Sequence, residues 1–118
     1  MSAVALISDL LMQSQVAAAA QRAGAEIAIV ATDDALLAKA ENLRPRLVIV
    51  DLSHPGLDPR QLFDRLQPLL PPEVTTVAFG PHVHKQRLAA AREAGFGLVV
   101  SRGQFHAEME EILKRYAT

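Results

Sequence analysis

The fold is decided by residues 47–59, LVIVDLSHPGLDP, where four consecutive apolar residues run straight into an aspartate. A strand carries apolar side chains at every position, rather than at alternate ones, when helices cover both faces of its sheet. The stretch therefore predicts a central strand of a parallel sheet, with Asp51 at its carboxyl end. In open α/β sheets ligands bind at that edge, because the loops leaving it diverge where the strand order reverses. We expect Asp51 to mark the functional edge of the molecule.

Length and composition indicate one domain, residues 1–118, able to bury about two-thirds of its unfolded surface. The chain has no cysteine, which excludes disulfides, thiolate metal sites and cysteine nucleophiles and makes the cytoplasm the default compartment. A formal charge of −1 with no evident basic face argues against direct binding of nucleic acid. The apolar run at residues 4–7 is too short to span a bilayer and follows no positively charged leader, so no membrane association is expected.

The rest of the chain alternates between short apolar runs and helical patterns. Asp58 and Pro59 mark one helix start, because aspartate caps a helix and proline fits its first position, whereas Gly24 and Gly95 close two other helices. The expected strands are residues 4–7, 26–30, 47–51, 75–79 and 98–101. The expected helices are residues 10–23, 33–42, 59–70, 83–94 and a last one with Phe105, Met109, Ile112, Leu113 and Tyr116 on its core face. This alternation predicts a doubly wound α/β fold with a parallel sheet, right-handed crossovers and helices on both faces.

Residues 45–58, PRLVIVDLSHPGLD, resemble the receiver domain of bacterial two-component response regulators, the CheY-like family. They match its hydrophobic strand, its phosphoacceptor aspartate, a proline four residues later and an acidic helix start. Residues 91–95, AREAG, resemble the end of the family's fourth helix. The resemblance covers essentially the whole chain. It implies a flavodoxin-like sheet of five parallel strands in the order 2-1-3-4-5.

The resemblance also implies a chemistry for the carboxyl edge of the sheet. Asp51 corresponds to the nucleophile that accepts a phosphoryl group from a histidine kinase or a small phosphodonor, provided that a cation neutralises charge on the incoming group. Magnesium is the implied cofactor, held by Asp9, Asp51 and the main-chain oxygen of Ser53, because such hard oxygen ligands suit a small divalent ion. An alternative for Asp9 is that it simply caps the first helix.

The sequence departs from the family pattern at three places. Ser8 replaces the first of the two acidic residues that follow the first strand. Gly80 stands where the fourth strand normally ends in a threonine or serine, whose hydroxyl bonds the phosphoryl group. The lysine and proline that normally end the fifth strand are replaced by Ser101 and Arg102. Either of these can take the lysine's place, and Arg102 is a candidate partner for a phosphoryl group or for Asp51.

Three loop histidines, His54, His82 and His84, follow the third and fourth strands beside Asp51. Together they could ligate a transition metal, although loop histidines are commonly just solvated. A basic cluster is predicted to form the solvated face of the fourth helix and consists of Lys85, Arg87 and Arg92. In the family, the surface of the fourth helix, fifth strand and fifth helix is where receivers dimerise or meet effectors, which makes it the expected homodimer or partner surface here.

The leading hypothesis is an atypical receiver, or pseudo-receiver, degenerate in phosphorylation. Such a signalling module would act through contacts with a kinase or effector protein, would not be an enzyme and would require no cofactor. The alternative is a phosphorylatable stand-alone response regulator that uses Asp51 as a magnesium-dependent acceptor. A small hydrolase built on Asp51 and the histidines is disfavoured, because the sequence shows neither a Ser/His/Asp order nor a glycine-rich phosphate loop.

Overall fold

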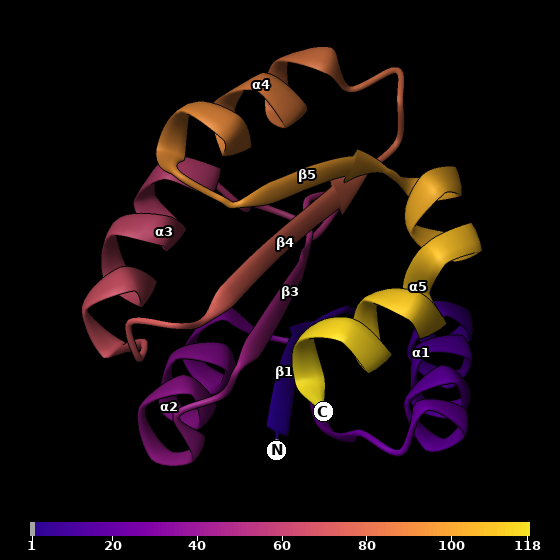
Figure 1. Ribbon diagram of the computed structural model, residues 1–118. Helices are drawn as coiled ribbons and strands as arrows, with labels where there is room; N and C mark the ends of the chain where they lie inside the picture. Colours follow the sequence, from indigo (N-terminus) through magenta and orange to yellow (C-terminus); the bar gives the residue numbers. More distant parts are fainter. Residues whose placement is uncertain (1) are drawn as a thin grey trace.

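The computed structural model describes residues 2–118 as a single five-stranded parallel sheet with helices on both faces (Figure 1). The strand order is β2-β1-β3-β4-β5, as the resemblance implies. In chain order the elements are β1 (Ser2–Leu6), α1 (Leu10–Ala23), β2 (Glu26–Val30), α2 (Asp33–Leu43), β3 (Leu47–Asp51), α3 (Pro59–Leu66), a short 3-10 helix (Gln67–Leu69), β4 (Thr75–Gly80), α4 (Lys85–Ala94), β5 (Leu98–Ser101) and α5 (Arg102–Ala117).

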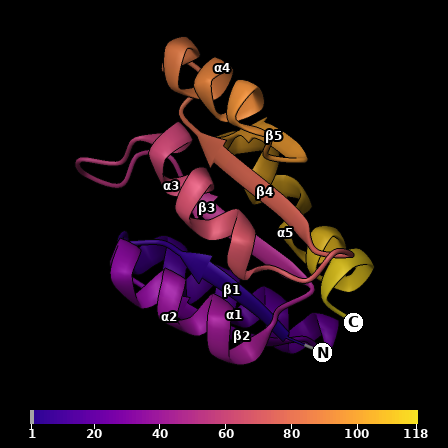
Figure 2. The ribbon, with the colours of Figure 1, turned by 90° about the vertical axis from the view of Figure 1, so that its left-hand side faces the viewer.

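The sheet separates two apolar cores. Residues such as Ala5, Ile49 and Phe79 point to the face covered by α1 and α5, where Phe79 stacks on Phe105 with ring centroids 4.1 Å apart. Alternate residues, such as Val48 and Val50, point to the face covered by α2, α3 and α4, which is turned to the viewer in Figure 2. All five residues of β3 are buried, so the prediction of a central strand covered on both faces is confirmed.

Side-chain caps begin four of the helices: Asp9 caps α1, Thr32 caps α2, Asp58 caps α3 and Ser101 caps α5. Gly24 ends α1 with a φ of 74°, a left-handed conformation that favours glycine. The helix predicted for residues 83–94 starts later, at Lys85, because residues 81–84 form a turn in which His84 N donates to Pro81 O. Within residues 2–118, no helix is both long enough and apolar enough to span a bilayer.

Candidate functional site

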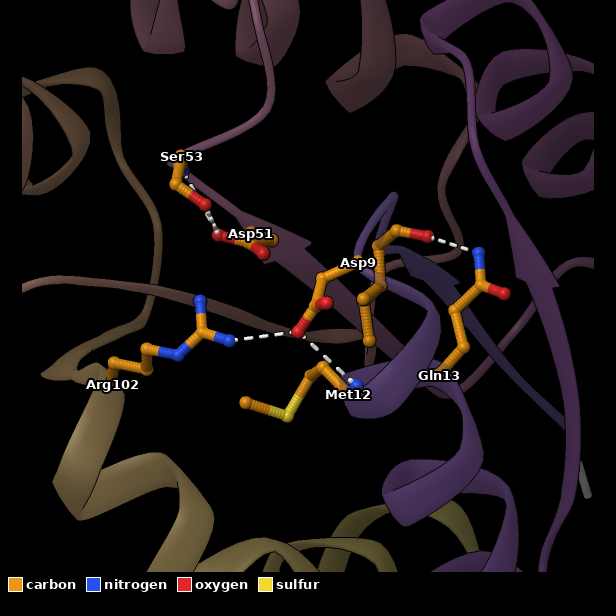
Figure 3. Close-up of polar contacts among 7 residues, drawn as sticks. Asp9, Met12, Gln13, Asp51, Ser53 and Arg102 are labelled. Atoms are coloured by element: carbon orange, nitrogen blue, oxygen red, sulfur yellow. Dashed lines mark hydrogen bonds and ion pairs between the residues drawn. The ribbon is translucent and has the colours of Figure 1, made fainter.

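Asp51 ends the central strand β3 at the carboxyl edge of the sheet. Its side chain is 1% exposed and belongs to the row that continues Leu47 and Ile49, which faces α1 and α5. Oδ1 accepts two hydrogen bonds from Ser53, one from the main-chain N–H at 2.9 Å and one from Oγ at 2.7 Å (Figure 3). These bonds hold the buried carboxylate against the start of the β3–α3 loop.

Asp9 lies in the turn between the neighbouring strand and α1: β1 ends at Leu6, which is in register with Val50 of β3, and Asp9 follows three residues later. Its Oδ2 accepts the main-chain N–H of Met12 at 3.2 Å, so Asp9 caps α1, which was the alternative to its role as a metal ligand. The same oxygen accepts a second bond at 2.8 Å from Nη2 of Arg102, the first residue of α5 (Figure 3). Arg102 was a candidate partner of Asp51, but its ion pair in this structure is with Asp9.

The register of β5 against β4 shows which residue lies at the end of β5. Ser101 is the last residue of β5 and lies opposite Gly80, the last residue of β4, whereas Arg102 already belongs to α5. Ser101 is therefore the residue at the end of β5, and its Oγ accepts the main-chain N–H of Gln104 at 3.1 Å as the cap of α5. The hydroxyl at this position already has a structural use.

Gly80 faces the other side of the sheet and is crowded there. A Cβ at this position would lie 3.2 Å from Cβ of Leu52 and 3.9 Å from Cδ2 of Leu88. The space that a threonine or serine side chain would need is thus partly filled by Leu52, which is itself 1% exposed. The missing hydroxyl is accompanied by packing of the β3–α3 loop and α4 over Gly80.

Arg87 makes a contact near Asp51 that the sequence did not predict. The basic cluster of α4 was predicted to be solvated, and Lys85 and Arg92 are exposed, but Arg87 is half-buried. Its Nη1 donates to the main-chain oxygen of Leu52 at 2.6 Å, directly after Asp51. No local pattern distinguishes Arg87 from its neighbours, because the partner is 35 residues away along the chain. The contact fastens α4 to the loop that follows Asp51.

The three loop histidines do not converge. His54 is half-buried, with Nδ1 3.3 Å from Ser8 Oγ and Nε2 3.5 Å from Asp33 Oδ1. The second distance allows an ion pair when the imidazole is protonated, but that Asp33 oxygen makes no well-aligned hydrogen bond in the described part of the chain. His82 and His84 are exposed. Among residues 2–118, no three His, Asp or Glu side chains are grouped so that they could hold a metal ion.

The residues predicted to bind magnesium do not fit the ion as they are arranged. Magnesium requires several hard oxygen ligands in near-octahedral geometry. Asp9 Oδ2 already accepts two N–H donors, one of them cationic, and Asp51 Oδ1 accepts two donors from Ser53. Ser8, where the family pattern has a carboxylate, contacts His54 instead. With Arg102 in place, the edge presents a positive group where the cation would have to bind.

One groove lies at the opposite end of the sheet, near the start of β4 and β5. Its volume is about 560 Å³ and its lining includes Phe63, Leu70, Thr75, Leu98 and Tyr116. A smaller hollow is lined by the consecutive residues 83–87 and so brings together no groups from different elements. Neither one places a second carboxylate or a nucleophile beside Asp51.

Comparisons with known proteins find likeness at the level of structure. No protein-family model matches the sequence, and a comparison with curated protein sequences finds no match. A CheY-like response regulator receiver domain from Methanospirillum hungatei is 18% identical with a TM-score of 0.81, and the match covers 97% of this chain and 90% of the other. A response regulator receiver domain from Bermanella marisrubri is 14% identical with a TM-score of 0.83, covering 99% and 98%.

A third similar structure has a metal in its site. It is the receiver domain of a Pseudomonas aeruginosa sensor histidine kinase with a magnesium ion coordinated in the active-site cleft, 18% identical with a TM-score of 0.80, covering 98% of this chain and 96% of the other. These matches span whole domains at low identity, and they agree with the strand order and helix placement described above. The chain therefore has the fold of the CheY-like response regulator receiver domains.

Proposed function

We propose that the chain is a receiver-like module of two-component signalling that acts through protein contacts and does not carry out magnesium-dependent phosphoryl transfer at Asp51. The observation that carries the proposal is the ion pair between Asp9 and Arg102, 2.8 Å between Oδ2 and Nη2. It occupies the carboxylate on which a divalent cation would depend. The module is not an enzyme, and it works in the cytoplasm.

The reason is electrostatic. Transfer of a phosphoryl group to a carboxylate brings two anions together, and catalysis depends on positive charge placed on the equatorial oxygens of the group. Asp9 is committed to Arg102 and to the cap of α1, Ser101 caps α5, and Gly80 supplies no hydroxyl. The groups left around Asp51 therefore stabilise the folded domain rather than a transferring phosphoryl group.

A second candidate function is a phosphorylatable response regulator. It is favoured by the placement of Asp51 at the end of the central strand, with both hydrogen bonds from Ser53 directed to a single oxygen. Intact mass measured after incubation with acetyl phosphate and magnesium distinguishes the two functions. We expect no phosphoryl adduct on the wild-type chain. An adduct that disappears in Asp51→Asn would overturn the first proposal and support the second.

The partner surface that we propose is formed by α4, β5 and α5. Val83, just before α4, is 67% exposed, Lys85 is exposed, and β5 is an edge strand with a half-buried Val99. This surface is offered to a kinase, to an effector or to a second copy of the chain.

Light scattering and crosslinking with candidate partners test this surface, and Lys85→Glu is the variant to use. Arg87 is a poor choice, because its hydrogen bond to Leu52 contributes to stability, so its replacement would change stability as well as surface charge. Glu93→Lys, on the same helix, serves as a second charge change, since its ion pair with Arg60 is 4.0 Å long and exposed and so contributes little to stability. An unchanged set of partners in both variants, together with a monomeric wild type, would count against the surface.

A further inference from the structure

We infer that Arg102 is a built-in cation that closes a latent divalent-cation site formed by Asp9 and Asp51. The inference deepens the proposed function, on which it rests, by naming what takes over the role of the metal. It makes the carboxyl edge of this sheet indifferent to divalent ions as long as Arg102 is present, and responsive to them once Arg102 is removed.

The first step is the place of the ion pair. Asp9 is the cap of α1 and Arg102 is the first residue of α5, and these two helices pack side by side on one face of the sheet (Figure 1). Asp51 belongs to the row of β3 that points to the same face. The ion pair therefore lies across the end of the sheet on the side to which Asp51 points, and the carboxylate of Asp51 is almost completely buried.

The second step is the charge balance. Two carboxylates at the ends of adjacent strands repel each other unless a cation stands between or beside them. A guanidinium carries its positive charge at every physiological pH and presents a planar set of N–H donors that suits carboxylate oxygens. Arg102 uses one of these donors on Asp9 Oδ2. The edge is therefore partly neutralised without any bound ion.

The third step separates this role from that of an ordinary surface ion pair. The side chains of Arg102 and Asp9 are 39% and 42% exposed, and a half-exposed pair contributes little to stability by itself. If the ion pair has no further role, removal of the arginine should change the stability of the fold only slightly and should leave metal binding unchanged. If Arg102 closes a site, its removal should increase metal binding, since the carboxylate of Asp9 is then released as a hard oxygen ligand beside Asp51 and the main-chain oxygen of Ser53.

The experiment is a titration with Mn²⁺ followed by electron paramagnetic resonance, in which the free ion is counted directly. Mn²⁺ accepts the same oxygen ligands as magnesium and binds such sites at least as tightly. We compare wild type, Arg102→Met, Arg102→Lys and the double variant Arg102→Met/Asp9→Asn. Arg22→Met is the matched control, because it removes an arginine from the ion pair with Glu110 on the same two helices.

We expect wild type, Arg102→Lys and Arg22→Met to bind Mn²⁺ with a Kd above about 1 mM. Arg102→Met is expected to bind at least about tenfold more tightly, because one positive charge has been removed from the site. The double variant loses this gain. In thermal unfolding, Mn²⁺ then raises the Tm of Arg102→Met alone, since a ligand that binds the native state stabilises it.

Two results would overturn the inference: equal Mn²⁺ binding by wild type and Arg102→Met, or a gain in Arg102→Met that survives Asp9→Asn. Circular dichroism checks that each variant folds. If Arg102→Met does not fold, Arg102→Gln replaces it in the same comparison. The titration measures metal binding in the absence of a phosphodonor, so its outcome is distinguished from that of the proposed function, which a phosphoryl adduct on the wild-type chain would overturn.

Discussion

The guanidinium of Arg87 donates to the main-chain oxygen of Leu52 at 2.6 Å, and this bond joins α4 to the residue that directly follows Asp51. Replacing Arg87 by methionine keeps much of the apolar stem and removes the donor. We expect a loss of about 1 kcal/mol in the free energy of unfolding, typical of one hydrogen bond from a charged group that is partly exposed. Urea denaturation measures it.

Arg92→Met is the control for this prediction, because Arg92 is an exposed arginine on the same helix. Its unfolding free energy is expected to stay close to that of wild type. Amide exchange adds a local readout, since Arg87→Met should speed exchange in the β3–α3 loop and at the start of α4 more than elsewhere. Equal stability of the two variants would show that the bond from Arg87 contributes nothing.

Restoring a hydroxyl at the end of β4 is expected to destabilise the fold. In Gly80→Ser the new Cβ would lie 3.2 Å from Cβ of Leu52, so Leu52 must shift by a few tenths of an ångström. Overpacking of this kind costs about 1–3 kcal/mol. A double-mutant cycle with Leu52→Gly, which removes the Cβ that the serine would meet, measures the coupling. The combined loss should be smaller than the sum of the single losses, and strict additivity would contradict the contact.

Ser101 acts as a helix cap. Ser101→Ala removes the acceptor for the N–H of Gln104, and we expect a loss of about 1 kcal/mol, the usual cost of deleting an N-cap. Ser101→Thr should retain most of the stability. Ser14→Ala, the same substitution at an exposed position inside α1, should be neutral or slightly stabilising. If Ser101→Ala is as stable as wild type, the hydroxyl of Ser101 does not stabilise the fold as a helix cap, and the prediction is wrong.

The ion pair between Arg22 and Glu110 gives stability a pH dependence. The hydrogen bond from Arg22 Nε, 2.5 Å from Glu110 Oε1, lowers the pKa of the Glu110 carboxyl, and the charges of Arg22 and Lys114 act in the same direction. Because the folded pKa is depressed, this contribution is present above the unfolded pKa and is lost as the pH falls through the folded one. Glu110→Gln should therefore be less stable than wild type at neutral pH, and the difference should vanish in acid.

Denaturation curves at several pH values test the sign of this effect. The control is Glu111→Gln, since Glu111 is exposed and forms no ion pair within the described residues. Its stability should follow that of wild type at every pH. A gap between Glu110→Gln and wild type that widens towards low pH would contradict the assignment.

Local sequence patterns predicted the elements of the fold well. The unbroken apolar run of β3, the Asp58-Pro59 start of α3 and the glycine that ends α1 are all determined by neighbours within a few positions, and the structure has them where the patterns place them. The same holds for Asp9 as a cap, because its partner Met12 is three residues away. Contacts between residues that are close in the sequence can be predicted from the sequence alone.

The electrostatics of the site could not be read in the same way. The partner of Arg102 is 93 residues away, and the sequence alone allowed it to face Asp51 or a phosphoryl group. Only the packing of α1 against α5 brings it to Asp9. The choice between Ser101 and Arg102 as the strand-end residue likewise depended on the register of β5 against β4, which periodicity does not determine.

Because Arg102 is part of the chain, the positive charge that it places beside Asp9 cannot be varied in the way that a bound ion can. A bound ion can be diluted, chelated or exchanged, whereas a guanidinium that is part of the chain is present in every copy at a fixed stoichiometry. In the function that we propose, the carboxyl edge stays partly neutralised by Arg102 and has one resting condition rather than two. Under that proposal, the effect of the chain on its partners depends on how many copies are present rather than on the supply of a divalent ion.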